Sequence, residues 1–511
     1  MSKKDFLPEG SQRDTGKDAQ RINIYIAKLV GEAVRTTLGP KGMDKMLVNS
    51  GGEVTVTNDG VTILRELELD HPVAKMIVQI AETQEDEVGD GTTTAVVLAG
   101  ELLKKAENLL DKNVHPAIIS KGYRVSADIS KKIAESYAFK ISEKDYVKIG
   151  MTAMTGKGSE DHKELLSKIV CEAIKIIKKD LNRKNINIEK KHGESTDKTS
   201  LIKGVVIDKE RIHSSMPKEK KGKVALLDIP LEIRSPDNDA KINISDPEKI
   251  QSLFEMEESL IRNLVNKISD SGTNILFCQK GIDDLAQYLL AKKGIYACRR
   301  VKKSDMEKLS KATGAKIVSD VLDLKNNFGF AKVKSHVVGD DEITIVTECE
   351  NPEVVTILVR GETSHVADEA KRAVEDAIGD VLAVYKNNKV VGGAGSFEIK
   401  LANDLRKEAK KFLGKEQLVI QAFADSLEII PRTLAENAGK DPLDVLSSVN
   451  ASGKDWPGVD VFEGVLIDAL KEGIIEPLKI KIQALSSASQ VANMILRIDD
   501  VILSQKSSTS E

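Results

Sequence analysis

Apolar side chains recur at helical spacing through much of the first 112 residues. The pattern predicts amphipathic helices at 18–38, 71–87 and 94–112, the first of which ends in a Gly-Pro pair. Between the first two helices, residues 53–63 alternate around an Asn-Asp-Gly turn, which predicts a β-hairpin. The beginning of the chain is therefore expected to form a helix-rich block.

The middle of the chain, at roughly 214–357, has a different pattern. Short apolar runs alternate there with helical periodicity, which is typical of an α/β domain. The predicted strands are 223–233, 274–279 and 295–301, and the predicted helices are 282–293 and 304–315. Helical periodicity returns after residue 361, so two helix-rich blocks flank an α/β insertion.

One long helix is predicted inside this insertion. Asp246 suits the N-cap and Pro247 the first helical position, and apolar side chains then recur at helical spacing as far as Ile268. The helix would contain about 23 residues and measure roughly 34 Å. Periodicity alone leaves two placements open: packing against the insertion, or projection from it as an arm.

Composition and charge narrow the class of protein. At 511 residues the chain is long enough for about three domains with cores of their own. Its 76 basic and 80 acidic side chains nearly cancel, which argues against nucleic acid or an acidic membrane as a partner. No apolar run reaches the roughly 18–20 residues of a membrane span, and the first 20 residues lack a signal peptide's apolar core. We expect a soluble, cytoplasmic protein.

The cysteines and histidines indicate neither a disulfide framework nor a zinc site. The cysteines are scattered without a Cys-x-x-Cys pair, and they are Cys171, Cys278, Cys298 and Cys349. The histidines lack the H-E-x-x-H spacing of zinc hydrolases. Buried free thiols are the expected state of the cysteines.

Three loops in the first hundred residues have compositions suited to a polyphosphate and its metal ion. They are 37–42, which follows a helix, Asn58-Asp59-Gly60, and 89–94, which leads into a helix. Free backbone N–H groups at a helix N-terminus bind anions. Asp90 offers the hard oxygen ligand that Mg²⁺ takes beside phosphate oxygens. Neither a Walker A motif nor the kinase motifs occur, so a nucleotide site would be built differently.

Each of these segments also has a simpler interpretation. Asn-Asp-Gly is common in plain turns, and Gly-Asp-Gly before threonines is common at helix caps. The glycine-rich segment 390–395 suits either close approach to a ligand or a mobile connection between domains. The joint occurrence of these segments is what favours a ligand site.

Six motifs together resemble those of the group II chaperonins, the family of the archaeal thermosome. They are TLGPKGMDKMLV at 37–48, TNDGVTILRE at 57–66, VGDGTTTAVVLAGELL at 88–103, MTGKG at 154–158, FCQKGIDDLAQ at 277–287 and RTLAENAG at 432–439. The resemblance extends over nearly the whole chain. It implies an ATP-dependent chaperone that hydrolyses MgATP. It also implies two stacked rings of identical or paralogous subunits, which enclose unfolded polypeptides.

The resemblance further implies a multidomain fold of α and α/β type. It assigns 1–143 and 394–511 to a mainly helical equatorial ATPase domain, 144–213 and 358–393 to a small α/β intermediate domain, and 214–357 to an α/β apical domain. Residues 234–269 match the helical protrusion that serves as a built-in lid. This match favours the arm placement of the long helix.

The resemblance implies the site residues position by position, inside the six motifs and outside them. Asp90 matches the Mg²⁺ ligand, and Asp59 and Asp376 match catalytic carboxylates that position the attacking water. Lys157 matches a lysine that senses the γ-phosphate, and Glu476 matches the acidic residue that accepts the ribose hydroxyls. The remaining nucleotide contacts are Thr37, Leu38, Gly39, Pro40, Gly91, Thr92, Thr93, Thr94, Gly393 and Gly395.

Three of these residues have alternative interpretations. Asp376 alone is typical of a solvated helix face, Lys157 of a surface loop and Glu476 of a helix end. An aspartate pKa near 3.9 would make Asp376 a poor proton acceptor, so we expect it mainly to orient water. The resemblance places Asp376 on the intermediate domain and Asp59 and Asp90 on the equatorial one. Closure of the hinge would then complete the site.

Two segments depart from the family's pattern. The family's triple glycine is Gly393-Ala394-Gly395 here, and the added methyl group predicts weaker nucleotide binding or slower closure. The tail also lacks the Gly-Met-rich ending common among relatives. Two other functions remain open: an ATP-independent scaffold or holdase on the same fold, and a small-molecule kinase or ATPase.

Overall fold

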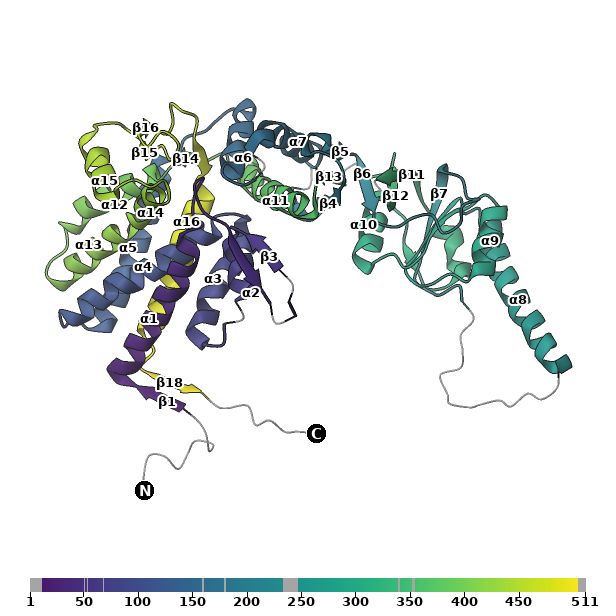
Figure 1. Ribbon diagram of the computed structural model, residues 1–511, viewed down its shortest axis with the longest axis horizontal. Coiled ribbons are helices and arrows are strands. Elements are labelled where there is room, and N and C mark those ends of the chain that lie inside the picture. Colours follow the sequence, from purple (N-terminus) through teal and green to yellow (C-terminus); the bar gives the residue numbers. More distant parts are fainter. Residues whose placement is uncertain are drawn as a thin grey trace, which may run out of the picture. The chain divides into compact units, whose positions relative to one another are not determined.

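The computed structural model describes most of the chain (Figure 1). The described residues are 12–49, 51–52, 54–67, 69–158, 160–178, 181–232, 247–338, 341–351 and 354–503. They form two compact units: unit 1 comprises 1–167 and 372–511, and unit 2 comprises 168–371. The predicted arrangement of two helix-rich blocks around an α/β insertion is confirmed.

Unit 1 is mainly helical. Its helices are α1 (Gly16–Arg35), α2 (Gly60–Glu66), α3 (Pro72–Val88), α4 (Thr92–Asp111), α5 (Pro116–Tyr137), α6 (Tyr146–Met154), α12 (Ser396–Ala409), α13 (Lys415–Leu427), α14 (Ile429–Asn437), α15 (Pro442–Ala451) and α16 (Leu478–Leu496). Helices α7 (Lys163–Ile176) and α11 (Ser364–Asn387) contain the two boundaries with unit 2. The predicted helices at 18–38, 71–87 and 94–112 therefore form, with their ends shifted by up to three residues.

Short antiparallel strand pairs complete unit 1. They are β1 (Gln12–Thr15) with β18 (Asp500–Leu503), β2 (Lys45–Val48) with β3 (Val54–Thr57), β14 (Val390–Gly392) with β17 (Ile475–Pro477), and β15 (Pro457–Val459) with β16 (Leu466–Asp468). The pair β14–β17 brings the glycine-rich segment beside residues 475–477, which are more than 80 positions away in sequence. This pairing matters for the candidate site described below.

Helix α4 lies at the centre of the core of unit 1. All nine residues from Ala95 to Leu103 are buried. A helix that is buried on every side must be surrounded by other elements, and α1, α3, α13 and α16 pack around it. The first turn of α4 is therefore attached to one of the most firmly packed elements of the unit.

The predicted hairpin at 53–63 is wrong in its second half. Strand β3 pairs with the preceding strand β2, and the residues after the Asn-Asp-Gly sequence form helix α2. The Asp59 side chain caps this helix by accepting a hydrogen bond from the backbone N–H of Thr62 at 2.8 Å. Val61 and Ile63 are both buried, and two apolar residues at this spacing fit a short helix as well as a strand.

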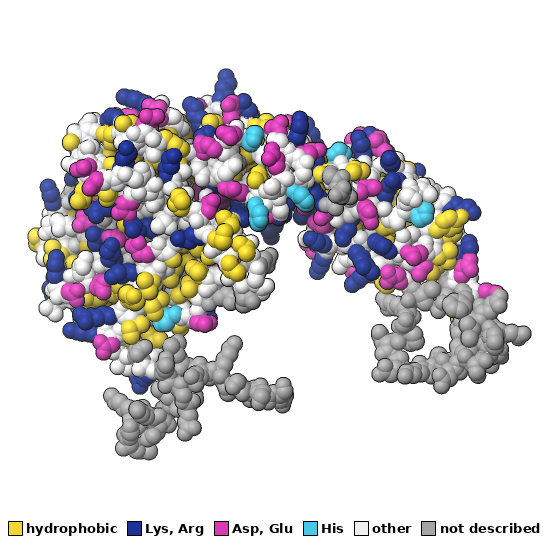
Figure 2. Space-filling view, viewed as in Figure 1, with side chains coloured by type: hydrophobic (Ala, Val, Ile, Leu, Met, Phe, Trp, Pro, Cys, Tyr) yellow, Lys and Arg dark blue, Asp and Glu magenta, His cyan; other side chains and the backbone are white. Residues whose placement is uncertain are grey.

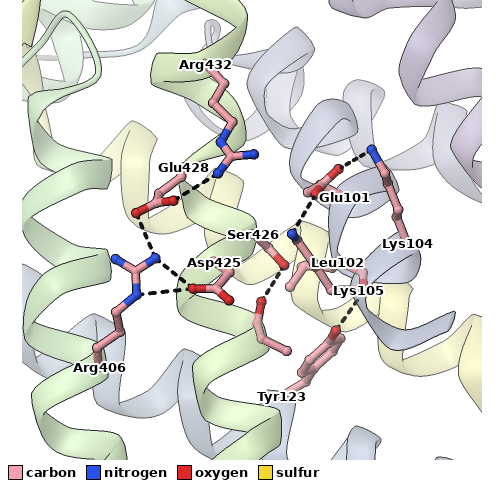
Figure 3. Close-up of polar contacts among 11 residues, drawn as sticks. Glu101, Leu102, Lys104, Lys105, Tyr123, Arg406, Asp425, Ser426, Glu428 and Arg432 are labelled. Carbon is pink, nitrogen blue, oxygen red and sulfur yellow. Dashed lines mark hydrogen bonds and ion pairs between the residues drawn. The ribbon is translucent and has the colours of Figure 1, made fainter. Parts of the chain in front are cut away.

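A polar network fastens α12, α13 and α14 to one another (Figure 3). Arg406 on α12 donates to Asp425 on α13 and to Glu428 between α13 and α14, both at 2.7 Å. Arg432 on α14 contacts the second oxygen of Glu428 at 3.4 Å. The Glu428 side chain is only 11% exposed, so this carboxylate is largely removed from water and two guanidinium groups compensate its charge. The network holds α14, which supports the loop after α1.

Unit 2 has an α/β core. Its elements are β4 (Ile186–His192), β5 (Ser200–Ile202), β6 (Gly204–Ile207), β7 (Glu219–Leu227), α8 (Pro247–Asp270), β8 (Ile275–Cys278), α9 (Asp284–Lys292), β9 (Tyr296–Cys298), α10 (Lys303–Thr313), β10 (Ile317–Val318), β11 (Gly329–Val338), β12 (Asp341–Thr347) and β13 (Val355–Gly361). The larger sheet has the order β6-β12-β11-β7-β8-β9, with β10 beside β7, and a second sheet has the order β4-β13-β5.

The larger sheet of unit 2 is covered on both faces. Alternate residues of β7, β8 and β9 pack against α8 and α9 on one face and against α10 on the other. These three strands run parallel, as expected for strands connected through helices. The predicted strands and helices of the insertion are thus confirmed, although β7 begins and ends earlier than the predicted strand at 223–233.

The long helix α8 is confirmed, and it combines the two placements that the sequence left open. Ile261, Val265 and Ile268 in its second half are buried against unit 2. Met256 and Leu260 are 59% and 56% exposed, and Figure 1 shows the beginning of the helix extending beyond the sheet. The predicted N-cap Asp246 and the side chains of 250–254 lie outside the described residues.

The cysteines are in the state that the sequence predicts. All four cysteines are free thiols, and Cys171, Cys278 and Cys298 are buried, as the sequence predicts. Burial raises the pKa of each of these three thiols, which keeps them protonated.

Within the described part of the chain, no helix combines the length and apolar character needed to cross a membrane.

Exposed apolar side chains gather on unit 1 over α1 and the β2–β3 hairpin (Figure 2). Tyr25 and Leu29 on α1 are 58% and 50% exposed. Met46 and Val48 on β2 are 70% and 63% exposed. Concentrated apolar surface of this kind is typical of protein–protein contact.

Candidate functional site

Two of the predicted loops, 37–42 and 58–60, are in close contact with other segments of unit 1. A methyl group placed on Gly60 would lie 2.5 Å from Thr93 Oγ1, so the loop that carries Asp59 touches the start of α4. A methyl group on Gly156 would lie 2.2 Å from the Cα atom of Pro40. The segment 154–158 therefore lies against the loop that follows α1, and close packing excludes a side chain at both glycines.

The start of α4 is shaped by two left-handed glycines and one buried amide. Gly89 and Gly91 have φ angles of 83° and 79°, which favour glycine. Gln84 is buried, and its Nε2 donates to the Asp90 carbonyl at 2.9 Å and to the Ile480 carbonyl at 3.3 Å. The first hydrogen bond of the helix runs from Ala95 N–H to the Gly91 carbonyl. The earlier N–H groups are not used within the helix and point toward its end.

The loop after α1 is held from behind by α14. Asn437 Nδ2 donates to the Leu38 carbonyl at 2.9 Å, and Thr37 Oγ1 donates to the carbonyl of Val34 at 2.9 Å. Thr37 and Leu38 are buried, so the turn at Gly39 and Pro40 is the more accessible part of the loop. Asn437 lies within the RTLAENAG motif, but sequence reasoning gave it no role, because its contact with Leu38 joins segments that are distant in sequence.

Lys157 and Asp376 form an ion pair at the centre of the site. Each side chain is 24% exposed, so the pair is partly accessible. Burial lowers the pKa of Lys157, but Asp376, Asp90 and Asp380 together raise it above its ordinary value. Burial and the charges of Asp90 and Asp59 raise the pKa of Asp376 to about 7 against the opposing effect of Lys157. The structure thus brings together Lys157 and the three aspartates that the sequence singled out.

Asp380 is a fourth aspartate of this cluster, and sequence reasoning missed it. It lies one turn after Asp376 on α11, is 2% exposed, and its Oδ1 has no hydrogen-bond partner. Burial, then the charges of Asp90 and Glu476, raise the pKa of Asp380 well above its ordinary value. A methyl group on the neighbouring Gly379 would lie 2.6 Å from the Val88 carbonyl, so α11 packs directly on the Asp90 loop. The i, i+4 spacing from Asp376 is the signal that could have identified it.

Asp59 is oriented by its own helix. Its Oδ2 accepts hydrogen bonds from Thr62 N–H at 2.8 Å and from Thr62 Oγ1 at 2.6 Å. Its backbone N–H donates to Thr57 Oγ1, which also accepts a hydrogen bond from Arg372. A carboxylate held in this way loses little conformational entropy when it binds a ligand.

The glycine-rich segment lies beside Glu476. Val391 of β14 pairs with Glu476 of β17, and a methyl group on Gly393 would lie 2.6 Å from Glu476 Oε1. Gly395, with φ of 75°, packs instead on Pro431 and Leu434 of α14, the same helix that supports the loop after α1. Of the two predicted contact glycines, Gly393 therefore borders the Glu476 carboxylate and Gly395 serves close packing.

Ala394 adopts a backbone conformation that favours glycine. Its φ is 53°, and its methyl carbon lies 3.0 Å from the position that a side chain would occupy on Gly458. The left-handed conformation costs a residue with a side chain about 1–2 kcal/mol. The departure from the family's triple glycine therefore places strain between β14 and α12.

A buried lysine fixes Glu476 from the other side. Lys481 Nζ lies 2.5 Å from Glu476 Oε2 and 3.0 Å from Glu398 Oε1. Burial and Glu398 raise the pKa of Glu476, whereas Lys481 lowers it. Sequence reasoning singled out Glu476 and missed both partners, which are unremarkable as isolated charges in α12 and α16.

The residues present fit a Mg²⁺-bound polyphosphate. Asp90 and its neighbouring carboxylates supply hard oxygen ligands, and the start of α4 and Lys157 supply groups that bind anions. Among the described residues, no group of three or more acidic, histidine or cysteine side chains forms a metal cage. Mg²⁺ is typically held by one or two carboxylates and the phosphates rather than by such a cage, so this finding is consistent with the fit.

Sequence comparisons place this site in a known family. Residues 30–506 match the model of the TCP-1/cpn60 chaperonin family. The chain is 53% identical to thermosome subunit beta of Methanothermobacter thermautotrophicus, with 99% of this chain and 95% of that protein aligned. It is 49% identical to thermosome subunit alpha of the same organism, over 97% of this chain and 93% of that protein. It is 52% identical to a thermosome subunit of Methanopyrus kandleri, over 98% and 95%. The chain therefore belongs to the TCP-1/cpn60 chaperonin family and is a group II, thermosome-like chaperonin subunit, an ATP-dependent chaperone.

Proposed function

We propose that this chain binds MgATP at the cluster around Lys157 and hydrolyses it. The observation that carries the proposal is the ion pair of Lys157 with Asp376, which faces Asp59 and Asp90 beside the start of α4. Phosphoryl transfer depends mainly on positioning and on compensation of charge, and this arrangement supplies both. Membership of the chaperonin family supports nucleotide use in general terms.

In this proposal the start of α4 and Asp90 bind the phosphates and their metal ion. The backbone N–H groups of Thr92, Thr93 and Thr94 bind phosphate oxygens, together with the turn at Gly39 and Pro40. Asp90 holds Mg²⁺, which when bound neutralises charge on the phosphate oxygens. Gln84 fixes the loop by its bond to the Asp90 carbonyl, so the carboxylate starts from a defined backbone.

Asp59 and Asp376 act on the attacking water. Asp59 is oriented by Thr62 and positions the water. The pKa of Asp376 is raised to about 7, which makes it a far better proton acceptor than an ordinary aspartate. We therefore extend the expectation from sequence, which gave Asp376 an orienting role alone, and assign it the proton of the water as well.

Lys157 couples phosphate binding to the ability of Asp376 to contact the attacking water. Its ammonium group pairs with Asp376, and both side chains are accessible to a ligand. A γ-phosphate competes with Asp376 for this ammonium group, because a phosphate carries more negative charge than a carboxylate. Transfer of Lys157 to the phosphate leaves Asp376 free to contact water, so the site becomes competent only when the triphosphate is present.

We further propose that hydrolysis drives domain closure in a ring of identical or paralogous subunits. The intermediate segments 144–213 and 358–393 contain the two unit boundaries, which supports their role as hinges. The apolar surface over α1 and the β2–β3 hairpin supports contact with another subunit (Figure 2). Thermosome relatives named alpha and beta occur in one organism, which supports paralogous partners.

The client is proposed to be an unfolded polypeptide, enclosed by a lid at 234–269. The exposed Met256 and Leu260 on α8 support an arm, and residues 233–246 lie outside the described part of the chain. We do not assign the segment 279–293 to the client surface, because its Leu285, Leu289 and Leu290 pack in the core of unit 2. Deletion of 242–264 should leave ATP hydrolysis intact and abolish encapsulation. Full protection of a trapped client after the deletion would refute the lid.

Asp376→Asn tests the proposed hydrolytic site. We expect phosphate release to fall by about 100-fold or more while ATP binding persists, because loss of a proton acceptor typically costs 10²–10⁴-fold. Asp455→Asn is the matched control, since Asp455 is exposed in the same unit. Unchanged turnover in Asp376→Asn would refute the catalytic role. Chaperone activity without any turnover, in the wild-type protein, would favour an ATP-independent holdase.

A further inference from the structure

Lys481 is a buried cation that the proposed hydrolytic chemistry does not use. It lies in the first turn of α16 and its side chain is 8% exposed. Lysine is rarely buried to this degree unless acidic groups compensate its charge. Two carboxylates do so here, Glu398 Oε1 at 3.0 Å and Glu476 Oε2 at 2.5 Å. The three side chains come from α12, β17 and α16, so the triad joins separate elements.

The three members of this triad differ in access to a ligand. The Glu398 side chain is 3% exposed, and its Oε2 has no hydrogen-bond partner. The Glu476 side chain is 23% exposed. Glu398 and Lys481 are thus closed off, and Glu476 is the member that can contact a ligand. Lys481 acts on a ligand only through Glu476.

One ion pair and the pairing of its strand hold Glu476 in place. Lys481 binds Oε2, and on the Oε1 side the absence of a side chain at Gly393 leaves the space that the carboxylate occupies. The backbone of β17 is fixed by its pairing with β14 and by the bond from Leu478 N–H to the Lys389 carbonyl at 3.0 Å. A carboxylate fixed in this way accepts hydrogen bonds from two neighbouring hydroxyl groups without first being ordered.

We propose that Lys481 is a positioning residue that fixes Glu476 as an oriented carboxylate, and that this fixation makes the site select nucleotides with a vicinal diol over deoxynucleotides. The inference rests on the proposed function, which assigns the ribose to Glu476. Glu398 in turn holds Lys481, which otherwise has a long and flexible side chain. Hydrogen bonds to a charged acceptor give this selection its strength.

The test compares ADP with 2′,3′-dideoxy-ADP, which lacks both hydroxyl groups. Affinities are measured by titration calorimetry with Mg²⁺ on the purified full chain. The wild-type protein should prefer ADP by about 10- to 100-fold, the range expected for hydrogen bonds to a charged group. Lys481→Met should reduce this preference to about threefold or less while leaving the affinity for the dideoxy nucleotide unchanged. Lys481→Arg, which retains the charge, should keep most of the preference.

Two further variants separate the possible failures. Glu476→Gln should lose the preference as Lys481→Met does. If Glu476→Gln keeps the full preference, the ribose assignment and this inference both fail. If Glu476→Gln loses it and Lys481→Met keeps it, the inference about Lys481 alone fails. Should Lys481→Met not fold, the double variant Lys481→Met/Glu398→Gln decides the question, because it removes the buried charge that the single variant leaves unpaired. Retention of the full preference in the double variant would overturn the inference.

Discussion

Lys157 and Lys481 each face carboxylates at the candidate site of unit 1, but they are buried to different degrees. Lys157 and Asp376 are both 24% exposed, whereas Lys481 and Glu398 are 8% and 3% exposed. A pair that a ligand can reach is exchangeable, and a pair that it cannot reach is permanent. The same chemistry therefore serves a switch at Lys157 and a fixed support at Lys481.

The first way to test this comparison is to remove each lysine and measure stability. Lys481→Met should destabilise the nucleotide-free protein by about 3–5 kcal/mol, because it leaves buried carboxylates without their cation. Lys157→Met should cost about 1 kcal/mol, since Asp376 can take up a proton and its side chain contacts water. Differential scanning calorimetry at one scan rate measures both, and the exposed Lys479→Met is the control on α16. Equal losses from the two variants would contradict the comparison.

Turnover should respond in the opposite order. Lys157→Met should lower phosphate release at saturating ATP by about 100-fold, the loss expected for a group that stabilises developing charge. Lys481→Met should change it less than threefold, because Lys481 touches no phosphate in this account. Steady-state phosphate release at increasing ATP concentrations gives both values. A larger loss of turnover from Lys481→Met than from Lys157→Met would contradict the assignment of the switch to Lys157.

Asp380 offers a test of the unpaired charge beside the Lys157 pair. Its pKa in the folded protein is raised above the ordinary 3.8, so the folded state holds a proton that the unfolded state releases as pH rises. Asp380 therefore costs stability progressively above about pH 4. Asp380→Asn should raise the thermal midpoint by a few degrees at pH 8 and by less at pH 5, in the absence of nucleotide and Mg²⁺. The same gain at both pH values would show that Asp380 is not protonated on folding.

Ala394 lies between β14 and α12, and its replacement should have the smallest effect of the four changes. Ala394→Gly should raise stability by about 0.5–1 kcal/mol, because relief of the left-handed strain exceeds the added entropy of glycine in the unfolded chain. It should also tighten nucleotide binding if the methyl group hinders approach at Gly393. Thermal melting and ADP titration measure the two effects. A loss of stability would mean that the surroundings favour alanine despite its φ.

The local sequence pattern predicted single helices and strands better than it predicted which strands pair. Helices α1, α3, α4 and α8 follow from apolar periodicity, and their first residues can be read from local signals such as Pro72 at the first position of α3. The hairpin at 53–63 failed because Asp59 is equally suited to a turn and to a helix cap, and the contact with Thr62 decides between them. The pattern of apolar and polar residues carries no information on the hydrogen bond between Asp59 and Thr62.

The candidate site was predictable where it follows a motif and not where it depends on packing. Asp59, Asp90 and Lys157 lie in recognisable motifs, Asp376 followed from the family resemblance alone, and the structure brings all four together. Lys481, Glu398 and Asn437 were missed, because each acquires its partners only through tertiary contacts between distant segments. Asp380 was the one missed residue with a local signal, its spacing from Asp376.

The most direct measurement is a structure of the full chain with Mg²⁺ and a non-hydrolysable ATP analogue. We predict that Asp90 binds the metal ion, that Asp59 and Asp376 flank the terminal phosphate, and that Lys157 leaves Asp376 for that phosphate. It also predicts Glu476 at the ribose hydroxyls with Lys481 still on its Oε2. A metal ion bound away from Asp59 and Asp90 would contradict the proposed hydrolytic site.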